Sequence, residues 1–141
     1  FLRFGLEGLK KRNPQDLSGG EKQRLALCVA LGKEADYYFL DEPTKGMDAK
    51  SKKIFGELLK EWTKMEKSIV MVSHDMEFTA KYADEISLLY QGEIIVQCPV
   101  REFMEENQFY TTGMNRVTRR VNPHIITIED VKKYAKRKNS Q

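Results

Sequence analysis

Acidic residues and a histidine follow two short apolar runs of the sequence. Residues 37–40 (YYFL) precede Asp41 and Glu42, and residues 68–72 (SIVMV) come shortly before His74. Two adjacent carboxylates at the end of a strand can divide labour, because one can hold a divalent cation while the other takes a proton from water. A histidine on a neighbouring strand can position that water or donate a hydrogen bond to a terminal phosphate. Together these residue types suit hydrolysis of a nucleoside triphosphate.

A second group of residues suits the binding of an anion. Ser18, Gly19 and Gly20 lie ahead of LALCVAL, residues 25–31, a run of helix-formers that is apolar on nearly every side. We expect a helix that begins near Gly19 or Gly20 and buries most of its circumference. The N–H groups of its first turn have no partners inside the helix and can bind a phosphate, with the serine hydroxyl as a further donor.

Each of these features also has a purely structural interpretation. Ser18 can be a simple helix cap, and Asp48 can cap the amphipathic segment that follows it. Asp41 and Glu42 can cap the segment after the first strand, and His74 can be a structural side chain. These interpretations are independent of one another, whereas a single chemical role explains all the features in this order along the chain.

Hydrophobic spacing predicts the elements that must position the acidic pair and the histidine. The apolar run 37–40 predicts a buried strand and the β-branched run 68–72 predicts a second strand. The helical spacing of apolar residues within 54–65 predicts a crossover helix between them. The order strand, helix, strand implies a parallel pair. Because ligands of such sheets bind beyond the carboxyl ends of the strands, the acidic pair and the histidine are expected at one edge.

The second half of the chain predicts further elements. Residues 86–97 predict a hairpin with Gly92 in its turn, and a short helix is expected at 100–106. A last helix is expected after Thr127, which would be its cap, with Asp130 at the capping-box position. We expect the end of this helix, KKYAKRKNSQ (132–141), to be frayed.

Composition limits the classes of protein to which the chain can belong. It has 141 residues, of which 40% are apolar and 32% charged, as in a globular protein with a core. No apolar run approaches the roughly 20 residues of a membrane span. Residues 114–141 hold eight basic and two acidic residues, so the net charge of +3 combines a basic tail with an acidic body. Two distant cysteines predict neither a disulfide framework nor a metal cluster, and free buried thiols are expected.

The order and spacing of the polar motifs over at least residues 14–100 resemble those of ATP-binding-cassette (ABC) ATPases. The resemblance rests on the signature LSGGEKQR (17–24), the Walker B strand YYFLDEPT (37–44), the D-loop KGMD (45–48) and the switch-histidine segment VSHD (72–75). Glu21 stands where glutamine is commonest in the signature.

Two further stretches narrow the resemblance. PTKGMD (43–48) and FYTTGMNRVTR (109–119) look most like the cobalt or energy-coupling-factor transporter ATPases, in particular the second cassette of fused two-cassette proteins. The implied fold class is α/β, a partial P-loop NTPase (ABC ATPase) fold with parallel strands, crossover helices, a C-terminal hairpin and short helices. The implied division is a cassette part over residues 1–113 and a basic tail with a short helix over 114–141.

The sequence lacks the phosphate loop G-x-x-x-x-G-K-[ST] that the family pattern places before the signature. The aromatic segment for the adenine and the glutamine-bearing loop are also missing. We therefore expect the chain to be the C-terminal part of a cassette, and to be inactive by itself.

The resemblance implies a role for each candidate residue in a head-to-tail dimer of cassettes that encloses ATP and Mg²⁺. Asp41 would help to hold Mg²⁺, Glu42 would polarise the attacking water, and His74 would contact the γ-phosphate. The ATP bound by the partner cassette would be contacted by the signature residues Ser18, Gly19, Gly20 and Glu21, with Asp48 at the dimer interface.

The expected function is that of the ATP-hydrolysing subunit of an ABC transporter, of the energy-coupling-factor type, that imports a metal ion or vitamin. Its expected partners are a second cassette and a transmembrane subunit, and its expected place is the cytoplasmic face of the cell membrane. No nucleic acid is expected as a partner. The alternatives are a non-transport ABC ATPase acting on nucleic acid or ribosomes, and a folded fragment that only supplies a signature motif to a complete cassette.

Overall fold

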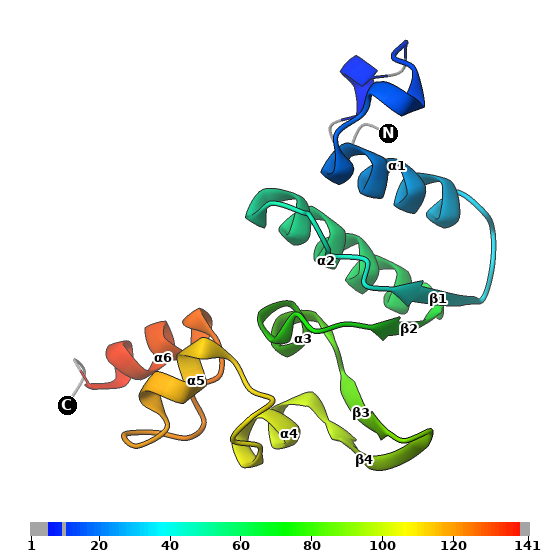
Figure 1. Ribbon diagram of the computed structural model, residues 1–141. Coiled ribbons are helices and arrows are strands. Elements are labelled where there is room, and N and C mark those ends of the chain that lie inside the picture. Colours follow the sequence, from blue (N-terminus) through cyan, green and yellow to red (C-terminus); the bar gives the residue numbers. More distant parts are fainter. Residues whose placement is uncertain (1–5, 10, 139–141) are drawn as a thin grey trace. The chain divides into compact units, whose positions relative to one another are not determined.

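The computed structural model describes residues 6–9 and 11–138 of the chain (Figure 1). The chain divides into two compact units, the first ending at His74 and the second beginning at Asp75. Each unit is described by itself. The division expected from the sequence, at residue 113, stays a prediction.

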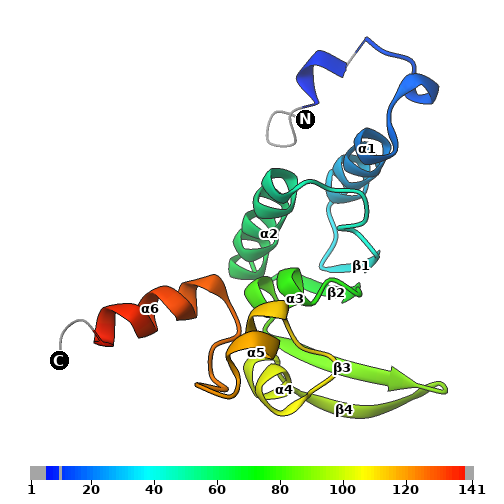
Figure 2. The ribbon, with the colours of Figure 1, turned by 60° about the vertical axis from the view of Figure 1, so that its left-hand side comes forward.

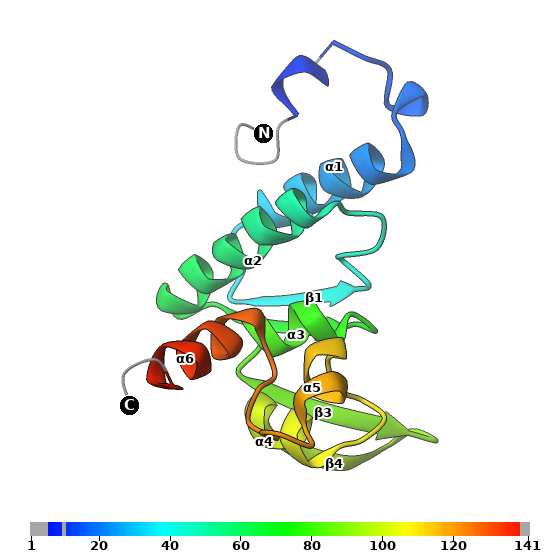
Figure 3. The ribbon, with the colours of Figure 1, turned by 90° about the vertical axis from the view of Figure 1, so that its left-hand side faces the viewer.

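The first unit contains a parallel pair of strands joined by a helix. Its elements are the 3₁₀ turns η2 (Glu7–Leu9) and η3 (Pro14–Asp16), α1 (Gly19–Leu31), β1 (Tyr37–Asp41), α2 (Ala49–Lys64) and β2 (Ser68–Val72). β1 and β2 pair in parallel, from Tyr37 opposite Ser68 to Asp41 opposite Val72. Figure 3 shows α1 and α2 on the same side of this strand pair. The predicted strand, helix, strand unit is confirmed.

Burial in β1 differs from the sequence prediction of a wholly buried strand. Tyr38 and Leu40 are buried, whereas Tyr37 and Phe39 are 69% and 77% exposed. Successive side chains of a strand point to opposite faces, and in the described part of this unit helices cover only one face. The continuous apolar run therefore has one covered and one open face.

Helix α1 begins where the sequence predicts but is less buried than expected. Its buried residues are Leu27 and Leu31, and Val29 is 57% exposed. Only one stripe of α1 is covered by the described part of the unit. Cys28 is free and half-buried, as is Cys98 in the second unit. The prediction that α1 buries most of its circumference is therefore wrong. The two thiols are free as predicted but only half-buried.

The second unit packs short helices against a hairpin. It contains α3 (Met76–Tyr82), the antiparallel strands β3 (Glu85–Tyr90) and β4 (Glu93–Pro99), α4 (Val100–Glu106), α5 (Gly113–Thr118) and α6 (Ile128–Lys138). Gln91 and Gly92 form the turn, both with positive φ. In Figure 2, α4 lies against the hairpin. The core holds Ala80, Phe103, Met104 and Ile126. The sequence did not predict α3 or α5.

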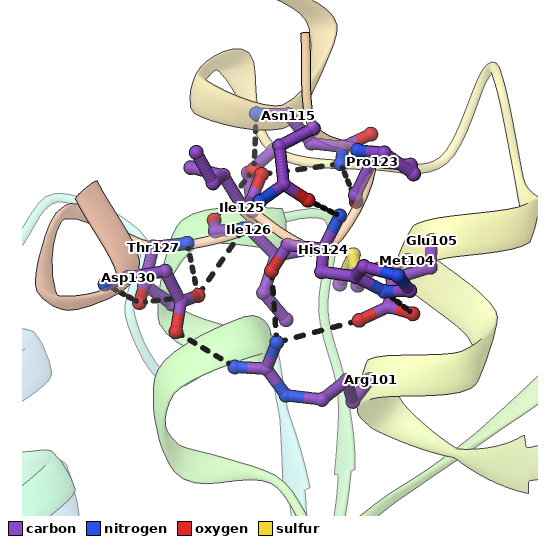
Figure 4. Close-up of polar contacts among 12 residues, drawn as sticks. Arg101, Met104, Glu105, Asn115, Pro123, His124, Ile125, Ile126, Thr127 and Asp130 are labelled. Atoms are coloured by element: carbon purple, nitrogen blue, oxygen red, sulfur yellow. Dashed lines mark hydrogen bonds and ion pairs between the residues drawn. The ribbon is translucent and has the colours of Figure 1, made fainter. Parts of the chain in front are cut away.

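The segment between α5 and α6 is held by polar contacts to side chains of α4 and α5 (Figure 4). The amide of Asn115 donates to the carbonyls of Pro123 (2.7 Å) and Ile125 (3.1 Å). The guanidinium of Arg101 donates to the His124 carbonyl (3.0 Å) and to Asp130 (2.9 Å). These contacts fix the start of α6.

Thr127 and Asp130 cap α6 as predicted. The Thr127 N–H donates to Asp130 Oδ2 (3.0 Å), and the Asp130 N–H donates to Thr127 Oγ1 (3.3 Å). The fraying predicted for residues 132–141 is wrong over 132–138, which belong to α6, and residues 139–141 lie outside the described residues. No helix in the described part of the chain is both long enough and apolar enough to cross a bilayer.

Candidate functional site

The acidic pair and the histidine lie at one edge of the β1–β2 pair. The Glu42 N–H donates to the Val72 carbonyl (2.9 Å), which continues the pairing of the strands one residue beyond β1. The Glu42 Oε1 atom lies 3.5 Å from the His74 Nε2 atom. The structure thus confirms that these two side chains meet, because the carboxyl ends of parallel strands share an edge.

The Glu42 carboxylate has an uncompensated oxygen. Its Oε1 atom is shielded from solvent and accepts no hydrogen bond from any described residue, and the contact with His74 has only the length of an ion pair. The His74 side chain is 93% exposed. A buried polar atom without a partner is costly, so a water molecule or ligand bound beside Oε1 would be stabilised.

The backbone of Glu42 is in the left-handed region, with φ of 43°. This conformation is uncommon for a residue with a side chain and is found at turns and functional sites. It reverses the chain directly after β1, and the Lys45 N–H closes the turn by donating to the Glu42 carbonyl (3.1 Å). The turn directs the Glu42 side chain toward the end of β2.

Asp41 is the last residue of β1 and lies on the open face of the strand pair, together with Tyr37 and Phe39. Its side chain is exposed. In the described part of the chain no three acidic, histidine or cysteine residues gather to form a metal cage. A single exposed carboxylate still suits Mg²⁺, which is commonly held by one or two carboxylates together with substrate phosphates.

The start of α1 is closed by a reciprocal capping box. The Ser18 Oγ atom accepts from the Glu21 N–H (3.3 Å), and Glu21 Oε2 accepts from the Ser18 N–H (2.8 Å). The hydrogen bond from the Ser18 backbone is the main cause that lowers the pKa of Glu21. The caps leave the Ser18 hydroxyl hydrogen and the N–H groups of Gly19 and Gly20 for a ligand.

Asp48 is the N-cap of α2. Its Oδ1 atom accepts from the Ser51 N–H at 2.7 Å, and the Asp48 side chain is otherwise exposed. The Ser51 N–H, followed by the Ser51 hydroxyl, lowers the pKa of Asp48. The structural interpretation of Asp48 as a cap is therefore realised, and a role at an interface stays a prediction.

Sequence reasoning missed two residues of α1, one that contacts the loop after β1 and one that contacts α2. The Gln23 amide donates to the carbonyls of Glu42 and Pro43, at 3.5 Å each, and the Arg24 guanidinium donates to the Ser51 hydroxyl at 3.5 Å. Gln23 and Arg24 lie three and four positions after Gly20. This spacing places all of them on one helix face and was the available signal.

The family model and two of the relatives that match this chain carry the description of ABC transporter proteins. The family described as ABC transporter matches residues 1–45. The chain is 46% identical over 129 residues to a putative ABC transporter ATP-binding protein of Bacillus anthracis, covering 92% of this chain and 23% of that protein. A protein of the same description from Clostridium tetani is 37% identical, covering 77% of this chain and 25% of that protein.

Solved structures agree. An ATP-binding cassette in a dimeric post-hydrolysis state bound to ADP and Pi has a TM-score of 0.63 and 30% identity, covering 67% of this chain and 41% of that one. The RNase-L inhibitor has a TM-score of 0.65 and 27% identity, covering 74% of this chain and 22% of that one. The fold is thus a partial P-loop NTPase fold of the ABC ATPase kind.

The chain is thus similar to ABC transporter ATP-binding proteins in sequence and to ATP-binding cassettes in fold. The chain spans about a quarter of the length of the curated relatives given above.

Proposed function

We propose that the chain supplies the hydrolytic edge and the signature helix of the ATP-binding subunit of an ABC transporter. The observation that carries the proposal is the meeting of Glu42 and His74 at 3.5 Å beyond two parallel strands. The uncompensated Glu42 Oε1 atom supports it, because a general base needs an oxygen that no other donor occupies to accept the proton of its water.

The proposed chemistry assigns one task to each residue at the edge. When bound, ATP would supply the phosphoryl group and Mg²⁺ would neutralise part of the phosphate charge. Asp41 would hold that cation. Glu42 accepts a proton at Oε1 from the attacking water, and its turn fixes that atom. His74, exposed on the neighbouring strand end, donates to the terminal phosphate from Nε2.

The signature residues act on a different nucleotide in this proposal. Ser18, Gly19 and Gly20 donate to the γ-phosphate of ATP held by a second cassette, and the capping box with Glu21 keeps the first turn of α1 in place. Asp48 lies at the interface with that cassette. Two cassettes therefore complete each other's sites, and their closing and opening move a transmembrane subunit.

The finer proposal is an energy-coupling-factor type transporter that imports a metal ion or vitamin, at the cytoplasmic face of the cell membrane. Its support is the pattern of residues 43–48 and 109–119. Thr112 and Asn115 of the second stretch are wholly buried and bind backbone groups, so that stretch also has a structural role in the second unit.

A second candidate is a non-transport ATPase that acts on ribosomes. The observation in its favour is the similarity to an archaeal ribosome recycling factor solved with a ribosomal stalk protein, with a TM-score of 0.64 and 26% identity over 74% of this chain. Affinity purification from membranes and from lysate separates the two. Recovery of a small membrane protein supports transport, and recovery of ribosomal subunits supports the second candidate.

The catalytic part of the proposal is tested with a full cassette, made by joining the phosphate-loop part of an ABC ATPase to the start of the chain. His74→Ala should lower ATP turnover at least ~10-fold, because a donor to the γ-phosphate is lost. Turnover that equals that of the unmodified cassette would remove His74 from the proposed mechanism.

A further inference from the structure

The Gln23 side chain touches the loop after β1 at two adjacent peptide groups. Its Nε2 atom lies 3.5 Å from the carbonyl oxygens of both Glu42 and Pro43. Both contacts are long for hydrogen bonds, but one amide serves two acceptors in a partly buried position. Gln23 is therefore the side chain of α1 that reaches the backbone beside the candidate base.

The backbone that Gln23 contacts is the least favourable one at the candidate site. Glu42 has a φ of 43°, and such a conformation persists only when surrounding contacts hold it. The Glu42 carbonyl has a second donor in the Lys45 N–H (3.1 Å). The Glu42 N–H also donates to the Val72 carbonyl of β2 (2.9 Å). Gln23 thus adds a donor from α1 to a turn that is held on its other side by β2.

We infer that Gln23 is a positioning residue, which holds the left-handed turn at Glu42 and ties it to the signature helix. This inference deepens the proposed function, on which its catalytic consequence rests. Gln23 lies one turn after Ser18, Gly19 and Gly20 on α1. A shift of α1 on binding a phosphate at its start would therefore move the turn that aims the Glu42 carboxylate.

The first test uses the 141-residue chain itself and needs no nucleotide. The reporter is hydrogen exchange of the Lys45 amide, measured by NMR, because that amide donates to the Glu42 carbonyl. Gln23→Glu keeps the shape but places a carboxylate against two carbonyl oxygens. We expect Lys45 exchange to become ~10-fold faster, while the Lys52 amide, bonded to Asp48 at the start of α2, changes less than ~2-fold.

Two variants make this test specific. Gln23→Lys keeps a donor of sufficient reach and should bring Lys45 exchange back to within ~2-fold of wild type. Ala26→Gln adds an amide to the exposed side of the same helix and should leave it unchanged. Equal Lys45 exchange in the wild type and Gln23→Glu would overturn the inference, as would a Gln23→Lys variant that exchanges as fast as Gln23→Glu.

The second test measures ATP turnover in the full cassette described above. Gln23→Glu should lower kcat ~10-fold with KM within ~2-fold, and Gln23→Lys should restore kcat, because the turn and not nucleotide binding is affected. An unchanged kcat in Gln23→Glu, or a loss confined to KM, would overturn the positioning role. If the unmodified cassette shows no turnover, the proposed function fails, while the exchange measurement still decides whether Gln23 holds the turn.

Discussion

Gly20 lies directly against the backbone of Gly46. A Cβ atom at Gly20 would come within 2.8 Å of the Gly46 carbonyl oxygen, whereas a Cβ atom at Gly19 meets nothing within 4 Å. Gly46 itself has a φ of 72°, which favours glycine. The first turn of the signature helix and the loop before α2 therefore approach as closely as two backbones without side chains allow.

The close contact between Gly20 and Gly46 predicts opposite effects on stability for alanine substitutions at two neighbouring glycines. Gly20→Ala should reduce the free energy of unfolding by about 1–3 kcal/mol, because the new methyl group overlaps a carbonyl that belongs to the backbone. Gly19→Ala is the matched control, and should be neutral or stabilising by up to about 1 kcal/mol. Urea unfolding monitored by Trp62 fluorescence measures both. Equal effects of the two substitutions would refute the close contact.

The role of Glu42 predicts a separation of binding from turnover in the full cassette. Glu42→Gln keeps the shape of the side chain but removes the base, so ATP hydrolysis should fall by at least ~100-fold. ATP-driven dimerisation, followed by size-exclusion chromatography, should persist because the binding groups remain. Near wild-type hydrolysis by the variant would show that another group activates the water.

Removal of the Asn115 amide should cause a large loss of stability in the second unit. Its amide satisfies two carbonyls in a position with 0% exposure, while its own Oδ1 accepts no hydrogen bond from a described residue. Asn115→Ala should cost about 2–4 kcal/mol, because the Pro123 carbonyl loses the Asn115 amide, the Ile125 carbonyl keeps only the longer contact from the Thr118 hydroxyl (3.4 Å), and a cavity remains. Val117 on the same helix is 81% exposed, so Val117→Ala should change the free energy of unfolding by no more than about 0.5 kcal/mol. Comparable losses in thermal unfolding of both variants would contradict this assignment.

Asp130 predicts an acid-sensitive start of α6. Burial alone would raise the pKa of Asp130, but hydrogen bonds from Thr127, Ile126 and Arg101 outweigh it and lower the pKa below its ordinary value of 3.8. A carboxyl whose pKa is lower in the folded state stabilises that state above its ordinary pKa, and this contribution is lost as pH falls through the folded pKa.

The Asp130 contribution can be isolated by substitution. Asp130→Asn should lower stability at pH 7 by about 1–3 kcal/mol, and the difference from wild type should shrink below pH 3.8. Glu129→Gln is the control on the same helix, since it removes only a half-exposed ion pair with Lys81 and should cost at most about 1 kcal/mol. A wild-type advantage that is constant with pH would contradict the assignment.

The sequence predicted those elements that depend on local spacing. The parallel strands, the crossover helix, the hairpin and the caps at Thr127 and Asp130 follow from periodicity and turn chemistry, and so does the meeting of Glu42 and His74. Two short helices, α3 and α5, were missed, although α4, which is equally short, was predicted. Each of the two begins at a side-chain cap, Asp75 and Thr112, that was not recognised in the sequence.

Burial and tertiary contacts were harder to predict from the sequence. An apolar run such as residues 37–40 does not reveal whether one or both faces of its strand are covered, which is why the exposure of Tyr37 and Phe39 was not foreseen. The contact between Gln23 and the Glu42 turn depends on how α1 packs on a loop 19 residues away. The left-handed backbone of Glu42 has no signal in a sequence, because glycine is the residue that this conformation favours.

The central claim is that the chain provides the hydrolytic edge but needs a phosphate loop from elsewhere to act. Its most direct test is Mg·ATP binding and hydrolysis by the 141-residue chain alone, beside the same chain extended to a full cassette. We predict that only the extended form binds ATP and turns it over. Tight ATP binding and turnover by the short chain alone would contradict the account, because another cluster of this chain would then hold the phosphates.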